Sequence, residues 1–144
     1  MKLKRLLQKA DINWYKGELT MAEKVYTKNA PEAIGPYSQA VKVNGLVFTS
    51  GQIAINPASG NVEAVTIEEQ TEQVMKNLGA VLEAAGTSFD KAVKTNCFLK
   101  NMSDFSTFNG IYGNYFTSKP ARSCVAAAEL PKGVLVEVEV IAEL

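Results

Sequence analysis

Apolar and polar positions alternate with a period of two in several stretches of this 144-residue chain. Residues 38–43 and 46–50 are two such stretches, and Asn44-Gly45 lies between them. Asn-Gly between apolar runs is typical of a two-residue hairpin turn, because both turn positions need positive φ. The pattern therefore predicts a β-hairpin. Ile53–Ile55 is expected to continue as strand, and residues 56–61, rich in Asn, Pro and Gly, to form a loop.

A helical period follows this loop. Thr66 has the chemistry of an N-cap, and Glu69, three residues later, would complete a capping box. Small or apolar residues then recur at steps of three and four: Ile67, Thr71, Val74, Leu78, Val81 and Ala85. With Gly86 as the stop signal, the pattern predicts one helix with a single buried stripe.

The next alternating stretch, residues 93–99, predicts a strand. A second helix is expected to start near Ser103 or Asp104 and to bury Phe105, Phe108, Ile111, Tyr112, Tyr115 and Phe116. Gly110 and Gly113 inside this helix cost about 1 kcal/mol each relative to alanine. That cost indicates close packing of the helix against another surface.

Two more strands are predicted, over residues 122–127 and 134–144. In the second, four valines face one way, and Glu137 and Glu139 face the other. The order β-β-β-α-β-α-β-β favours an α+β two-layer sandwich, with two helices on one face of a small mixed or mostly antiparallel sheet. The uncovered face would be partly apolar, with Phe98, Leu135 and Ile141. Association with other copies of the chain is therefore expected.

The first twenty residues differ from the rest, with five basic and two acidic side chains and leucines at helical spacing. Met21 resembles a second start. We interpret residues 1–21 as a leader from an upstream start or an added extension, and residues 22–144 as a single domain. A short amphipathic arm that docks on the domain is the alternative. The leader lacks the apolar run of a secretory signal.

Composition narrows the function. The formal net charge is zero, which argues against a general nucleic-acid surface, and there is no histidine to bind a metal or act as a base. The two cysteines have neither zinc-site nor disulfide-framework spacing, and no phosphate-binding glycine motif occurs. No apolar run is long enough to span a membrane. We expect a cytoplasmic protein without metal or cofactor.

The candidate chemistry centres on Arg122, because the only other arginine is Arg5 in the leader. A guanidinium offers a planar fork that fits a carboxylate or phosphate. A surface ion pair is the plainer alternative. Glu137 lies in an otherwise apolar strand, which favours a partner or a raised pKa, although a solvated outward position explains it equally well.

Three further positions have two interpretations each. Tyr37 is either a ligand-facing or a core aromatic residue. Gly51, after Ser50, permits close approach of a ligand to the backbone, or marks a bulge. Cys124 is a potential nucleophile, but without a histidine to activate it a small buried apolar role is favoured.

Residues 22–144 closely resemble the RidA family (YjgF, reactive intermediate deaminase). The resemblance rests on segments in matching order: Asn29-Ala30-Pro31, Ala33–Ala40, Thr49–Ile53, Pro120–Val125, Leu130–Lys132 and Val136–Ala142. Residues 1–20 lie outside it. The resemblance implies a chorismate-mutase-like fold and a homotrimer with ligand clefts between subunits. The presence of Arg122 favours the deaminase branch of the family.

That branch hydrolyses 2-imino acids such as 2-iminobutanoate and 2-iminopropanoate, and their enamine tautomers, to 2-keto acids and ammonia without a cofactor. The resemblance implies that Arg122 binds the substrate carboxylate and that Glu137 positions or activates water. It also implies that the cleft is lined by Tyr37, Ser50, Gly51, Asn109 and the Cys124 backbone. A non-catalytic carboxylate-binding regulatory module remains an alternative. So does an endoribonuclease or translation initiation inhibitor, a label also used in this family.

Overall fold

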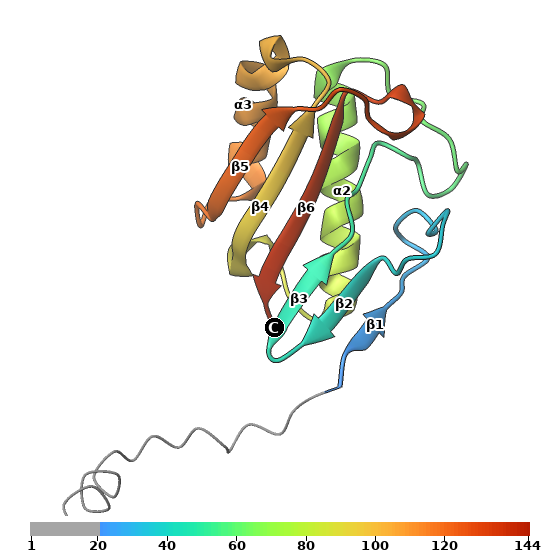
Figure 1. Ribbon diagram of the computed structural model, residues 1–144, viewed down its shortest axis with the longest axis vertical. Coiled ribbons are helices and arrows are strands. Elements are labelled where there is room, and N and C mark those ends of the chain that lie inside the picture. Colours follow the sequence, from blue (N-terminus) through green and yellow to red (C-terminus); the bar gives the residue numbers. More distant parts are fainter. Residues whose placement is uncertain (1–20) are drawn as a thin grey trace, which may run out of the picture.

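The computed structural model describes residues 21–144 and arranges them as a mixed six-stranded sheet with two helices behind it (Figure 1). The strands are β1 (Glu23–Val25), β2 (Ala40–Val43), β3 (Leu46–Thr49), β4 (Ala92–Leu99), β5 (Ala121–Ala126) and β6 (Val136–Glu143). The helices are α2 (Ile67–Ala85) and α3 (Phe105–Tyr115). Short 3-10 turns occupy Phe89–Lys91, Met102–Asp104 and Pro131–Gly133. The predicted α+β sandwich is confirmed.

The strand order across the sheet is β1-β2-β3-β6-β4-β5, and only the β4–β5 pair among these is parallel. Both helices cover one face, and the other face is open toward the viewer in Figure 1. The valines of β6 predicted to share one face are buried against the helices, and so is the predicted stripe of α2. The core therefore lies between the sheet and the helices.

The local signals for the hairpin and the first helix are confirmed. Asn44 and Gly45 both have positive φ, 51° and 77°. The Thr66 hydroxyl accepts a hydrogen bond from the Glu69 amide at 3.2 Å, and the Glu69 carboxylate accepts one from the Thr66 amide at 3.3 Å. Gly86 ends α2 with φ of 89°. These caps fix where α2 begins and ends.

The expected strand at Ile53–Ile55 is wrong. Only isolated bridges form there, between Gln52 and Val138 and between Ile55 and Val62. The buried side chain of Asn77 on α2 donates instead to the carbonyls of Ile53 and Ile55, at 3.0 and 2.9 Å. A helix side chain thus satisfies this segment's backbone, which leaves its alternating pattern without a strand partner.

Two other boundaries differ from expectation. Strand β1 is only three residues long and too short to show a period, so the sequence did not predict it. The last strand begins at Val136 and not at Val134, because Pro131–Gly133 forms a 3-10 turn in which Lys132 has φ of 56°. The predicted letter order is nevertheless the observed one, since β1 takes the place of the expected strand at Ile53–Ile55.

The expectation of close packing at the α3 glycines is wrong within this chain. Both Gly110 and Gly113 are exposed, and a methyl group at either would meet nothing within 4 Å among the described residues. Phe108, Tyr112 and Phe116 are buried as predicted, whereas Phe105, Ile111 and Tyr115 are only half-buried.

The predicted leader, residues 1–21, lies outside the described part of the chain except for Met21. Within residues 21–144, none of the helices combines the length and the apolar character that crossing a membrane requires.

We predict that Asn77→Ala lowers the free energy of unfolding by about 1–3 kcal/mol, because it removes the two buried hydrogen bonds that Asn77 donates to the carbonyls of Ile53 and Ile55. Chemical denaturation measures this change. Gln73→Ala is the matched control, since it removes only the 2.9 Å bond that Gln73 donates to Asn77. Equal losses in the two variants would contradict a special role for Asn77.

Candidate functional site

Arg122 and Glu137 point to opposite faces of the sheet. Arg122 pairs with Thr95 of β4, which is completely buried under the helices. Glu137 pairs with Phe98, three residues further along β4. Directly paired residues share a face and successive residues alternate. The two residues expected to act together are therefore separated by the sheet within one chain.

The Arg122 guanidinium lies against α3. Its Nη1 donates to Oδ1 of Asn109 at 2.6 Å. Its Cζ lies 4.7 Å from the centre of the Tyr112 ring and 5.5 Å from that of Phe105. Among residues 21–144 the structure shows an ion pair only between Lys42 and Glu23, so Arg122 has no acidic partner there.

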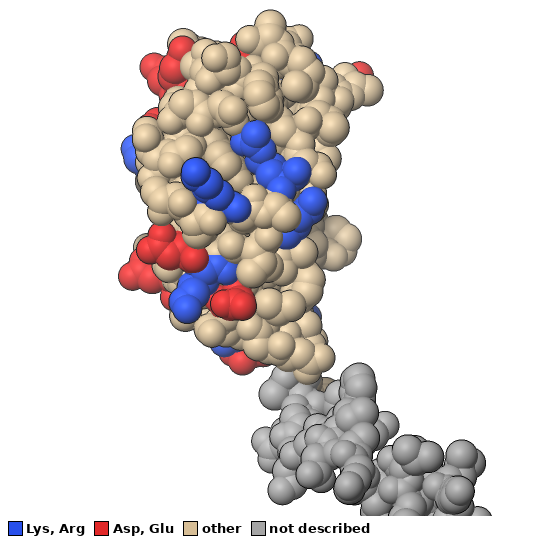
Figure 2. Space-filling view, turned by 90° about the vertical axis from the view of Figure 1, so that its left-hand side faces the viewer, with Lys and Arg blue, Asp and Glu red and all other residues tan. Residues whose placement is uncertain are grey.

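The depression in front of Arg122 measures about 470 Å³ and is lined by no acidic residue. On the side of the molecule that carries β5 and α3, Lys and Arg side chains gather in the middle of the surface (Figure 2). Most acidic side chains on that side lie toward its margins. An anion approaching Arg122 from this side therefore meets a favourable local charge.

Glu137 lies in a separate hollow of about 540 Å³. Tyr37, Ser50, Gly51 and Glu139 line the same hollow. A Cβ atom on Gly51 would overlap the Glu137 carboxylate and come within 2.8 Å of its Cδ. Gly51 is therefore required for the close approach of this carboxylate to the backbone, which favours the close-approach interpretation of the glycine.

The loop that carries Tyr37 is fixed by hydrogen bonds. The buried Gln39 amide donates to the carbonyls of Thr27 and Pro31, both at 2.9 Å. The Ser50 hydroxyl donates to the Ser38 carbonyl at 2.6 Å, so toward a ligand Ser50 can only accept. Tyr37 is about half exposed, which rules out a core role in this chain.

The Glu137 carboxyl has a raised pKa, because burial disfavours its charged form and the nearby Glu139 carboxylate repels the charge. Glu139 accepts a hydrogen bond from the Asn96 amide at 2.7 Å. Glu137 is thus held as a carboxyl group that takes up a proton more readily than an ordinary glutamate.

Neither cysteine is activated. Burial raises the pKa of the Cys97 thiol to about 12. Burial also raises the pKa of Cys124, and the Arg122 charge opposes this only in part. Both thiols are protonated at neutral pH, which supports the packing role expected for Cys124.

The predicted site residues therefore form two groups. Tyr37, Ser50, Gly51 and Glu137 share one hollow. Arg122 and Asn109 meet across β5 and α3, and Cys124 lies on the helix-facing side of β5 because it pairs with the buried Cys97. Residues 21–144 contain no group of three or more His, Cys, Asp or Glu side chains placed to hold a metal ion.

Sequence reasoning missed the residues that surround the site residues. Gln39, Thr95 and Tyr112 fix the site residues or their loop, and Glu139, bonded by Asn96, raises the pKa of Glu137. Tyr112 was predicted only as a core residue. Its position three residues after Asn109 on a helix is the one local signal that could have indicated contact with Arg122.

The sequence and the fold match those of known proteins. The model of the family described as "Endoribonuclease L-PSP" matches residues 27–144. "Putative regulator AldR" of Lactococcus lactis is 55% identical over 121 residues, which cover 83% of this chain and 96% of that protein. The mouse "2-iminobutanoate/2-iminopropanoate deaminase" is 47% identical over 119 residues, covering 82% and 88%.

Among solved structures, the Rid-family protein YyfA of Yersinia pestis superposes with a TM-score of 0.84 at 52% identity, covering 86% of this chain and all of that one. The chain therefore belongs to the L-PSP/RidA family, as the sequence motifs indicated.

We predict that the Glu137 carboxyl titrates above the ordinary glutamate pKa of about 4.3. Replacing Glu139 by Gln removes a repelling charge and should move the titration of Glu137 to lower pH. The ¹³C chemical shift of the Glu137 carboxyl, followed against pH, measures both. Glu143→Gln, on the same strand but exposed at its end, serves as the control. An unshifted midpoint in Glu139→Gln would contradict the coupling.

Proposed function

We propose that this protein hydrolyses reactive 2-imino acids, such as 2-iminobutanoate and 2-iminopropanoate, and their enamine tautomers to 2-keto acids and ammonia. Arg122 binds the substrate carboxylate. Glu137 accepts a proton from the attacking water and passes it to the imine nitrogen. Tyr37, Ser50, Gly51, Asn109 and Cys124 line the site. The observation that carries the proposal is the oriented Arg122 guanidinium, which has no acidic partner among residues 21–144 and lies in a depression lined by no acidic residue of that range.

The names of relatives support this assignment. The mouse relative is named for imine deamination, and its similarity covers most of both chains. Arg122 and Glu137 stand in the segments that carried the family resemblance. A guanidinium with one edge held by Asn109 keeps other donors for a small carboxylate.

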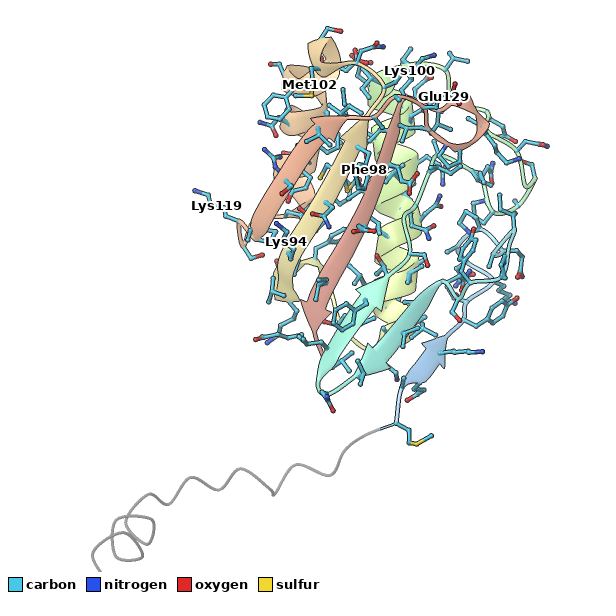
Figure 3. The ribbon with its side chains drawn as sticks, viewed as in Figure 1. Lys94, Phe98, Lys100, Met102, Lys119 and Glu129 are labelled. Carbon is cyan, nitrogen blue, oxygen red and sulfur yellow. The ribbon has the colours of Figure 1, made fainter. Side chains whose placement is uncertain are left out.

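Because Arg122 and Glu137 lie on opposite faces, the proposal places each active site between two copies in a homotrimer. One copy contributes the Arg122 side and a neighbour contributes the Glu137 side. The open sheet face offers an apolar surface for such a contact. Phe48 and Val125 are 41% and 51% exposed, and Figure 3 shows Phe98 on the open face of β4. Phe98 pairs with both Glu137 and Val125 in one row across the sheet.

The chemistry asks little of the protein. The iminium carbon is electrophilic, so a water oxygen adds to it while the C=N electron pair moves to nitrogen. Glu137 accepts the proton that the water loses and returns it to nitrogen, after which the C–N bond breaks and the carbonyl forms. The hydroxyl proton ends on the released ammonia. Positioning and general-base assistance of about 10²–10⁴-fold are sufficient contributions.

Two other functions have specific support. A regulatory carboxylate-binding module would fit the name of the Lactococcus lactis relative. Endoribonuclease activity would fit the family description. The zero net charge and the absence of histidine weigh against RNA cleavage.

We predict that the protein accelerates release of 2-ketobutyrate when added to a threonine dehydratase reaction. Arg122→Ala should reduce this acceleration by about 10- to 100-fold, because charge-assisted hydrogen bonds contribute about 1.5–3 kcal/mol each. Arg122→Lys should recover little, since lysine lacks the planar fork. Lys100→Ala removes an exposed cation at the end of β4 and is the matched control (Figure 3).

The outcomes separate the candidates. Full acceleration by Arg122→Ala would contradict the assignment. Calorimetric binding of 2-oxobutanoate by the wild type without any acceleration would favour the regulatory module. Ribonuclease activity that persists through successive purification columns and disappears in Arg122→Ala would favour the endoribonuclease.

A further inference from the structure

We propose that Tyr112, anchored by Thr95, is the positioning residue that sets the plane of the Arg122 guanidinium for carboxylate binding. The inference rests on the proposed function, because it assigns a part to residues behind the arginine of that site. It concerns two residues that sequence reasoning treated as core packing alone.

The residues come together through the register of two strands and the period of one helix. Thr95 of β4 pairs with Arg122 of the parallel neighbour β5, so both side chains leave the sheet on the helix side. Phe105, Asn109 and Tyr112 are spaced by four and three residues, and they form one stripe on α3. All three contact the guanidinium.

Two contacts constrain the guanidinium in different directions. Asn109 accepts from Nη1 at 2.6 Å, and a hydrogen bond of this kind lies near the guanidinium plane. Tyr112 presents its ring face with the Cζ atom 4.7 Å from the ring centre. A ring face attracts the cation and limits its tilt. Together they fix both the rotation and the plane, which a bidentate carboxylate requires.

Tyr112 is itself held rigidly. Its hydroxyl shares a hydrogen bond of 2.8 Å with the Thr95 hydroxyl, in a completely buried position. Its ring stacks on Phe116, with centres 4.4 Å apart and planes inclined by 25°. The buried hydrogen bond prevents the ring from sliding along α3 or turning. The fixed position of the Tyr112 ring therefore constrains the orientation of the Arg122 guanidinium that lies over it.

Because the chain has only two arginines, the contact between the Arg122 guanidinium and the Tyr112 ring can be followed by NMR. In the full chain only Arg122 and Arg5 give guanidinium Nε–H signals, which a ¹H–¹⁵N spectrum resolves from indole and amide signals by their ¹⁵N shift. The ring current of Tyr112 should displace the Arg122 side-chain signals. Tyr112→Leu should abolish this displacement, and Tyr112→Phe should keep most of it. Signals unchanged in Tyr112→Leu would overturn the proposed contact.

Equilibrium binding of 2-oxobutanoate to the full-length protein, measured by calorimetry, tests the consequence. Tyr112→Leu should weaken binding about tenfold, within the range of a desolvated cation–π contact. Tyr112→Phe and Thr95→Val should each weaken it about threefold, and the double variant no further, because both remove the same hydrogen bond.

Thr71→Val is the matched control for Thr95→Val. Thr71 is also a completely buried threonine, but its hydroxyl has no hydrogen-bond partner among the described residues and it lies on α2. The Thr71→Val variant should bind 2-oxobutanoate as tightly as the wild type.

Failure of this proposal is distinguishable from failure of the proposed function. If Arg122→Ala binds 2-oxobutanoate as the wild type does, the carboxylate clamp itself is wrong. If Arg122→Ala loses binding while Tyr112→Leu and Thr95→Val keep it and only melt earlier, Tyr112 is structural and the positioning role is overturned.

Discussion

Strand β4 pairs with β5 on one side and with β6 on the other, and the pleat of these three strands determines where the candidate site residues point. The register with Thr95 sends Arg122 toward the helices, and the register with Phe98 sends Glu137 to the open face. A shift of one residue in the β4–β5 pairing would turn Arg122 to the open face. The same shift in the β4–β6 pairing would turn Glu137 toward the helices and expose the valines of β6. Burial of the valines on one side of β6 thus determines that Glu137 points to the open face.

Hydrogen bonds from buried polar side chains hold the segments that surround the candidate site. Asn77 holds the segment after β3, Gln39 holds the loop before β2, and Thr95 holds Tyr112 behind the arginine. Each is buried, so each needs its partners and tolerates few other positions.

The sequence predicted the parts of the fold that local rules determine. The Asn44-Gly45 turn, the Thr66 capping box and the period of α2 depend on neighbouring residues, and all three are confirmed. Ile53–Ile55 alternates like a strand, yet a helix side chain more than twenty residues away takes its carbonyls. β1 is held by pairing with β2 and by burial of Val25 in the core, both of which are long-range contacts. Contacts between residues far apart in the sequence produce no local pattern from which these two features could be predicted.

In the candidate site, too, local sequence predicts which residues matter, but their arrangement depends on long-range pairing. Motifs identified Arg122 and Glu137, but their opposite orientation depends on the pairing of β4 with both neighbours. The contact of Tyr112 with Arg122 likewise requires α3 to cross behind β5, which helical spacing alone does not reveal. The spacing of Asn109 and Tyr112 could have suggested it only once Arg122 was placed.

In the proposed function, Arg122 of one copy works with Glu137 of another. Mixing inactive Arg122→Ala subunits with inactive Glu137→Gln subunits, by refolding them together at equal amounts, tests it most directly. In a ring of three, a random interface combines an intact arginine with an intact glutamate in about a quarter of cases. Imine hydrolysis is expected to return to about a quarter of the wild-type rate. A mixture that forms trimers and remains inactive would contradict it.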